Sequence, residues 1–120
     1  MFMLSRMLVG NTPPIVYMQP TDGETYQVGE ALKLASGKVT LCSGATTPEF
    51  VCVGPANGAG EVPCVAVQDY MEFETTLAVA PADSAAIGVG DKVTIHTDGM
   101  QVTATKTSGV AQIVALDGQA

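Results

Sequence analysis

The chain has 120 residues, of which 47% are hydrophobic and only 14% are charged, and its formal net charge is −7. An average soluble protein has about 25% charged residues, so we expect part of this surface to face another protein instead of water. The few basic residues do not cluster, which excludes direct nucleic-acid binding because that function needs a basic surface. No apolar run approaches the roughly 20 residues of a membrane span.

Residues 1–20 differ in composition from the rest of the chain. They hold four of the six methionines, and Pro13-Pro14 forbids a helix there and favours an extended path. We expect an extended, apolar N-terminal arm that either packs on its own domain or is buried by a neighbouring subunit. The candidate strand-addition element in this arm is the apolar tetrad Ile15, Val16, Tyr17 and Met18.

Residues 21–120 form one predicted β domain with an internal repeat. Val28-Gly29-Glu30 returns as Val89-Gly90-Asp91, and Val39-Thr40 returns as Val102-Thr103. Each copy reads as Val-Gly-acid, a short strand, a glycine turn and a second strand, and the copies span about residues 28–54 and 89–116. The offset grows from 61 to 63 residues between these two landmarks, which predicts a longer turn in the second copy. Two copies are too few for a solenoid and indicate a pseudo-symmetric β domain.

The stretches around the repeats also predict β structure. Thr21-Asp22-Gly23-Glu24 is a predicted turn, and Pro63 places the strand at 61–67 at a sheet edge or at a strand start. Residues 71–79 alternate as in a half-buried strand, and residues 81–87 hold the one predicted helical turn. Between the strands of the first copy, the small-residue loop 43–48 offers Thr46, Thr47 and Pro48 as further contact residues. Turn signals every eight to twelve residues predict an all-β fold, either a small sandwich or a barrel.

Residues capable of chemistry are few and scattered. Cys42, Cys52 and Cys64 have no CxxC spacing and, with the single His96, are too widely separated for a typical zinc site. The odd number of cysteines fits a reducing compartment better than a disulfide framework. We expect a mature chain made in a cytoplasm. Glu72 and Glu74 share one strand face and are interpreted as solubilising. We therefore expect no enzyme activity, no cofactor and no metal.

The repeated Val-Gly-acid strand starts and the small-residue turns resemble those of tailed-bacteriophage capsid decoration proteins, also called capsid cement proteins. The resemblance covers roughly residues 20–116, and the stretches on which it rests are 28–32, 36–40, 60–65 and 89–93. It implies a small β-rich structural protein that binds the outside of an assembled shell at the junctions between major capsid subunits, often as a trimer with neighbouring decoration subunits. Such a protein is made in the bacterial cytoplasm and ends on the virion surface.

Three alternatives stay open on the sequence alone. A β-barrel ligand-binding module predicts a hollow with converging polar or aromatic groups. A small enzyme would use His96 with a cysteine. A tail or head-completion component would assemble by itself into rings or tubes.

Overall fold

The computed structural model describes residues 1–7, 14–68, 71–77 and 88–114. Every regular element in these residues is a strand, so the prediction of an all-β fold is confirmed. None of the described residues belongs to a helix that could cross a membrane. The strands are β1 (Met3–Met7), β2 (Val16–Met18), β3 (Ala31–Ala35), β4 (Lys38–Leu41), β5 (Phe50–Cys52), β6 (Val62–Ala66), β7 (Met71–Glu74), β8 (Lys92–Val93) and β9 (Ala111–Gln112).

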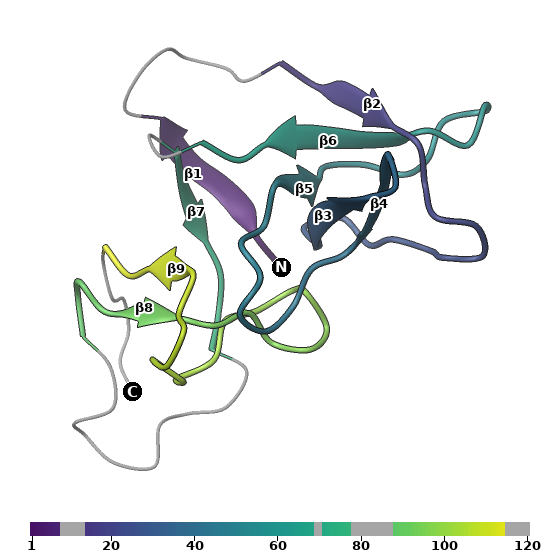
Figure 1. Cartoon of the computed structure of the whole chain (residues 1–120). Coiled ribbons are helices and arrows are strands. Elements are labelled where there is room, and N and C mark those ends of the chain that lie inside the picture. Colours follow the sequence, from purple (N-terminus) through teal and green to yellow (C-terminus); the bar gives the residue numbers. More distant parts are fainter. Residues whose placement is uncertain (8–13, 69–70, 78–87, 115–120) are drawn as a thin grey trace.

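A five-stranded antiparallel sheet with the order β2-β6-β5-β3-β4 is the largest unit of the fold (Figure 1). All five strands contribute to one apolar interior, because each supplies at least one residue to the same core cluster. The buried members of this cluster are Leu32, Val39, Cys52, Val62 and Cys64, with Val16, Met18, Tyr26 and Phe50 packed against them. The sheet therefore curls around its own core.

The carbonyl of Val39 joins the two ends of this sheet. It accepts hydrogen bonds from the Thr21 amide (3.2 Å), the Thr21 hydroxyl (2.9 Å) and the Tyr26 hydroxyl (2.6 Å). The Val39 amide in turn donates to the Gln19 carbonyl (2.8 Å), and Pro20 forms a parallel bridge with Val39. Since residues 19–21 directly follow β2, this contact brings the first strand of the sheet against the last.

The N-terminal segment packs on the same molecule. β1 pairs with β7 in a two-stranded antiparallel sheet, and Phe2 packs against a second core cluster formed by Ala31, Cys42 and Ile95. The Phe2 amide also donates to the Gly29 carbonyl at 2.9 Å. Of the two paths expected for the arm, the described parts of residues 1–20 follow the first, on their own domain.

The first Val-Gly-acid motif forms a tight turn that ends in a β-bulge. The Glu30 amide donates to the Gln27 carbonyl (3.0 Å), and Gly29 has φ +89°, as the third residue of a type II turn requires. The Glu30 carboxylate accepts the Gln27 amide at 3.0 Å. Gly29 and Glu30 both bond to Cys52 on the opposite strand, so two residues face one, as in a bulge.

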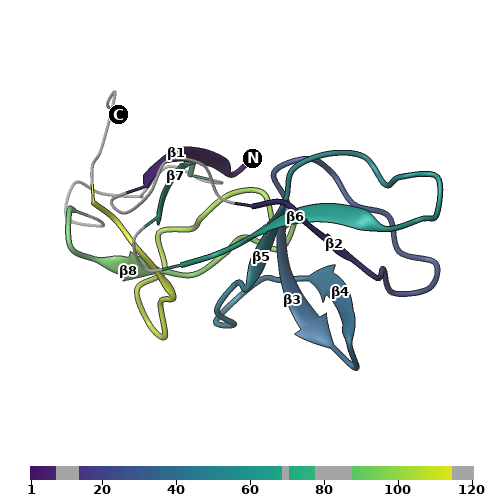
Figure 2. The ribbon, with the colours of Figure 1, turned by 90° about the horizontal axis from the view of Figure 1, so that it is seen from above.

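The second motif reproduces this turn bond for bond. The Asp91 amide donates to the Gly88 carbonyl (3.1 Å), Gly90 has φ +98°, and the Asp91 carboxylate accepts the Gly88 amide (2.8 Å). Gly90 and Asp91 both bond to Ile113. The two halves lie side by side along the long direction of the molecule (Figure 2).

The strand pairing after each turn is the same in both halves. β3 pairs with β5 and β8 pairs with β9, with Ala31 opposite Val51 and Lys92 opposite Gln112. The hairpin turn is Ser36-Gly37 in the first half, both at positive φ, which suits a two-residue turn. In the second half it spans residues 97–100, closed by the bond from the His96 amide to the Gln101 carbonyl. This longer turn accounts for the shift in offset.

The remaining sequence predictions have mixed outcomes. The turn at 21–24 is confirmed by a bond from the Glu24 amide to the Thr21 carbonyl. The strand predicted at 71–79 is observed only over its first four residues, as β7 (Met71–Glu74), and residues 78–79 lie outside the described residues. Pro63 does not mark a sheet edge, because β6 lies between β2 and β5. Instead it is the second residue of β6, which agrees with the strand-start alternative. The predicted helical turn at 81–87 lies outside the described residues.

The paired turn glycines allow a matched comparison of stability. An alanine at either position forces a side chain into the left-handed region, at a cost of about 1–2 kcal/mol. At Gly29 the added Cβ would also collide with Met1 and Phe2, whereas at Gly90 none of the described residues lies within 4 Å of it. We expect Gly29→Ala to lower the free energy of unfolding in urea more than Gly90→Ala does. Equal losses would show that the N-terminal segment does not pack against the first turn.

The buried Glu30 predicts a pH dependence. Glu30 is only 5% exposed. The pKa of its carboxyl group is raised from 4.5, first by burial and then by the charges of Glu24 and Asp98. The folded state therefore holds this proton more tightly than the unfolded chain does. The resulting stabilisation is fully present below the unfolded pKa and is lost as pH rises through the folded pKa.

We expect Glu30→Gln to gain stability relative to the natural chain as pH rises from about 4 towards 7. Urea unfolding across this range measures the difference. Asp91→Asn, at the same position of the second turn, is the control for changing the turn itself. Parallel stability profiles for Glu30→Gln and the natural chain would contradict the assignment.

Candidate protein-binding surface

Strand β2 is an edge of the five-stranded sheet. It pairs with β6 on one side, with Tyr17 opposite Pro63, and no described strand pairs along its other side. Downstream of β2 this outer side is occupied, because the Gln19 carbonyl accepts the Val39 amide. The open part of the edge is therefore the stretch around residues 15–17.

The direction of the backbone groups follows from Pro63. Its carbonyl accepts the Val53 amide at 2.9 Å and therefore points towards β5. The backbone amides and carbonyls of the neighbouring residues Val62 and Cys64 point the opposite way, towards β2. Because hydrogen-bonded and non-bonded pairs alternate along an antiparallel ladder, Tyr17 opposite Pro63 is a non-bonded pair. The amide and carbonyl of Tyr17 therefore point outward from the sheet, where another strand could pair with them.

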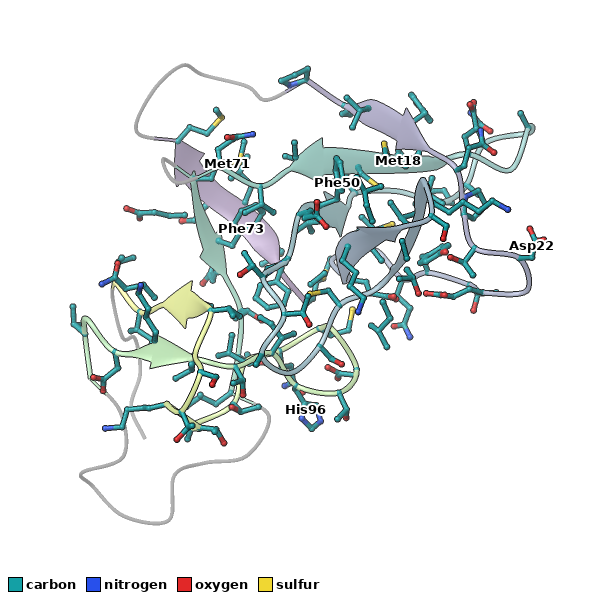
Figure 3. The ribbon with its side chains drawn as sticks, viewed as in Figure 1. Met18, Asp22, Phe50, Met71, Phe73 and His96 are labelled. Carbon is teal, nitrogen blue, oxygen red and sulfur yellow. The ribbon has the colours of Figure 1, made fainter. Side chains whose placement is uncertain are left out.

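The side chains of the predicted tetrad divide between the two faces of β2. Val16 and Met18 pack against the protein's own core, and Figure 3 shows Met18 and Phe50 on the strands that enclose it. Ile15 and Tyr17 are 55% and 53% exposed. Two of the four predicted contact residues thus serve the core, and the other two are available to a partner.

The loop with Thr46, Thr47 and Pro48 lies elsewhere. Thr46 and Thr47 are exposed and Pro48 is half-buried, and the loop is held by the bridge between Gly44 and Ile95 of the second half. No hydrogen bond or strand pairing among the described residues connects it with β2. The predicted contact residues therefore form two separate patches.

The structure adds a group of exposed valines that the sequence analysis did not select. Val28 lies in the first turn, just before Gly29, and Val53 directly follows β5. Val89 and Val114 occupy the same places in the second half. Their exposed fractions are 42% and 37% in the first half and 65% and 54% in the second. Each half thus presents an apolar pair beside its Val-Gly-acid turn.

A signal for these valines is present in the sequence. The residue before the glycine of a type II turn lies at the corner of the chain and faces outward. Val28 and Val89 occupy this position, and both are exposed in the structure. Reading the repeat as a turn, instead of only as a strand start, would have singled out Val28 and Val89.

The residues weighed for metal binding do not form a ligand cluster in the part of the chain that the structure describes. His96 lies in the second hairpin, well away from Met18 and the main core (Figure 3). The described residues contain no group of three or more histidine, cysteine or acidic side chains that could hold a metal ion. Glu72 and Glu74 lie in β7, which is covered along one edge by β1.

All three cysteines are buried thiols. Burial raises the pKa of Cys42 and of Cys52, and it raises the pKa of Cys64 to about 12, with the nearby Cys52 adding to the shift. A thiol that resists ionisation is a poor nucleophile. These side chains are therefore suited to packing in the core.

A hollow of about 300 Å³ lies between the Tyr26 segment and the glycine-rich loop, and it is lined by Pro20, Glu24, Thr25, Tyr26, Gly54, Pro55, Ala56, Gly60 and Val62. Its main polar groups are already bonded within the fold. The Tyr26 hydroxyl donates to Val39, and the Glu24 carboxylate accepts the Thr40 hydroxyl and the Leu41 amide, both at 2.7 Å. Burial is the main reason that the Tyr26 pKa is raised. The hollow therefore lacks the converging free polar groups expected of a ligand site.

Comparisons with known proteins add no relative to this description. No protein-family model matches the chain, and no significant match was found among curated proteins or among solved structures.

Proposed function

We propose that this chain is a structural protein, without enzyme activity, that binds the outer surface of an assembled phage capsid and stabilises the expanded shell at the junctions between capsid subunits. The observation on which the proposal chiefly rests is the open edge of β2, where the backbone of Tyr17 faces outward between exposed apolar side chains. The resemblance of the repeated turns to those of capsid decoration proteins supplies the partner.

The edge is suited to strand addition. A partner strand laid beside β2 would pair with the outward amide and carbonyl of Tyr17 and cover the Ile15 and Tyr17 side chains. Backbone pairing of this kind gives affinity with little demand on the partner's sequence, while the two apolar side chains provide selectivity. Only 14% of the residues of the whole chain are charged, and a contact with few charges has little charge to desolvate.

Stabilisation would follow by mass action. A protein that binds the expanded shell but not its precursor lowers the free energy of the expanded state, and occupation of many equivalent sites multiplies the effect. The major capsid protein is the proposed first partner. A neighbouring decoration subunit, in a trimer, is the proposed second, and either could supply the strand that pairs with β2.

The test is co-sedimentation with undecorated, expanded capsids. Removal of residues 1–20 is unsuitable, because it would delete β1, β2 and the Phe2 side chain from the fold. Tyr17→Pro is sharper, because it removes an outward amide that makes no bond to β6, and proline is tolerated on such an edge. Tyr17→Ala is the matched control, since it removes the same side chain and keeps the amide.

We expect saturable binding by the natural chain, weaker binding by Tyr17→Ala, and a further loss of about five- to tenfold for Tyr17→Pro, the equivalent of one hydrogen bond of roughly 1 kcal/mol. Thermal unfolding checks that both variants remain folded. Equal binding by the two variants would reject strand addition at β2. Absence of binding by the natural chain, together with self-assembly into rings or tubes, would favour a tail or head-completion component.

A further inference from the structure

Cys52 and Cys64 are direct cross-strand partners in β5 and β6. The Cys52 amide donates to the Glu30 carbonyl (3.0 Å) on the other side of β5, and Pro63 directs the Cys64 backbone towards β2. The two cysteines therefore form a non-hydrogen-bonded pair, in which Cα atoms are about 4.5 Å apart and side chains are closest. That separation lies within the range of about 4.4–6.8 Å found in disulfides.

Both thiols lie on the same side of the sheet, as opposite members of one cross-strand pair. They belong to one core cluster and are 1% and 0% exposed. Among the described residues, each thiol donates a hydrogen bond to a nearby backbone carbonyl, Cys52 to that of Gly54 (3.2 Å) and Cys64 to that of Val62 (3.5 Å). No side chain among the described residues hydrogen-bonds to either thiol.

The third cysteine is separated from this pair. Cys42 belongs to the second core cluster, with Ala31 and Ile95, and its sulfur contacts the Thr46 carbonyl at 3.1 Å. The chain thus carries its own control, because one thiol has no cross-strand cysteine partner.

We propose that Cys52 and Cys64 are an oxidisable pair that forms an intramolecular disulfide when the folded protein meets a small-molecule disulfide oxidant such as glutathione disulfide. One thiolate attacks the oxidant, which releases one glutathione thiol and leaves a mixed disulfide. The second cysteine then attacks that bond and releases the second glutathione. Two protein thiols lose two protons and two electrons, and the oxidant's S–S bond is reduced to two thiols.

The bond would tie β5 to β6 across the glycine-rich loop 54–60. Closing this loop covalently removes freedom from the unfolded chain, so the oxidised protein should resist unfolding more strongly. Reaction is slow at neutral pH, because burial holds the thiols protonated and because a local opening of the fold must first expose one of them to the oxidant. The protein would remain reduced where glutathione is mostly thiol and would cross-link on long exposure to oxidising surroundings. This inference does not depend on the proposed function.

The test uses the natural, full-length chain incubated with glutathione disulfide. Thiol titration after denaturation should fall from three to one per chain, and the intact mass should drop by two hydrogen atoms without a glutathione adduct. Cleavage after Glu49, Glu61 and Glu72 separates the three cysteines, so the linked fragments should be 50–61 and 62–72. The rate should rise about tenfold per pH unit below the thiol pKa.

The oxidised chain should unfold at a higher urea concentration than the reduced chain, and dithiothreitol should reverse the shift. Cys42→Ala should form the bond at the natural rate. Oxidation in concentrated urea is the control for the fold, and there the pairing should lose its selectivity. Persistence of all three thiols at raised pH, a glutathione adduct that does not close, or a bond that includes Cys42 would overturn the proposal.

Discussion

Both halves of this protein depend on a chain reversal that only glycine tolerates without strain. Gly29 and Gly90 occupy the positive-φ position of their turns, and the acid that follows each one accepts the amide three residues earlier. The bulge after each turn then fixes how β3 meets β5 and how β8 meets β9. A slip by one residue would exchange the faces of these strands, so the turn determines which side chains enter the core.

A second constraint joins the ends of the main sheet. The Val39 carbonyl accepts three donors from residues 21 and 26, and this cluster holds the segment after β2 against β4. The same contact uses the outer side of the chain at Gln19 and leaves it open at Tyr17. The closure of the sheet and the exposure of its free edge are therefore parts of one arrangement. The N-terminal segment that carries β2 therefore stabilises the fold and also provides the edge that a partner strand could bind.

Local patterns predicted the elements with local causes. The Val-Gly-acid repeat, its longer second turn, the turn at 21–24 and the alternating strand at Met71 all follow from backbone preference and side-chain period. The sequence could not show that Met3–Met7 pairs with β7. That pairing joins residues nearly seventy positions apart, and no pattern of apolar residues in either strand identifies the other as its partner. It also could not show that Val16 and Met18 face inward, since the direction of a short apolar strand is set by its neighbour β6.

The candidate surface was predicted only in part for the same reason. Residues 16–18 of the predicted tetrad lie in a strand and Ile15 precedes it, but which of the four residues are exposed depends on the register with Pro63. The loop at Thr46–Pro48 was selected for its small residues, and its distance from β2 is a property of the tertiary structure. The exposed valines were present in the repeat itself, and their outward direction follows from the turn geometry.

The repetition of a valine pair within one chain has a consequence for avidity. When one valine pair is bound, the other pair of the same chain stays close to the partner. The effective concentration of this second pair at the partner then far exceeds the concentration of free protein. An array with two like sites at the right spacing would then retain the chain even if each contact alone were weak. The pairs are also unequal, since the N-terminus packs beside the first turn and the valines of the second pair are the more exposed. An array that distinguishes the two pairs would therefore bind the chain in one orientation.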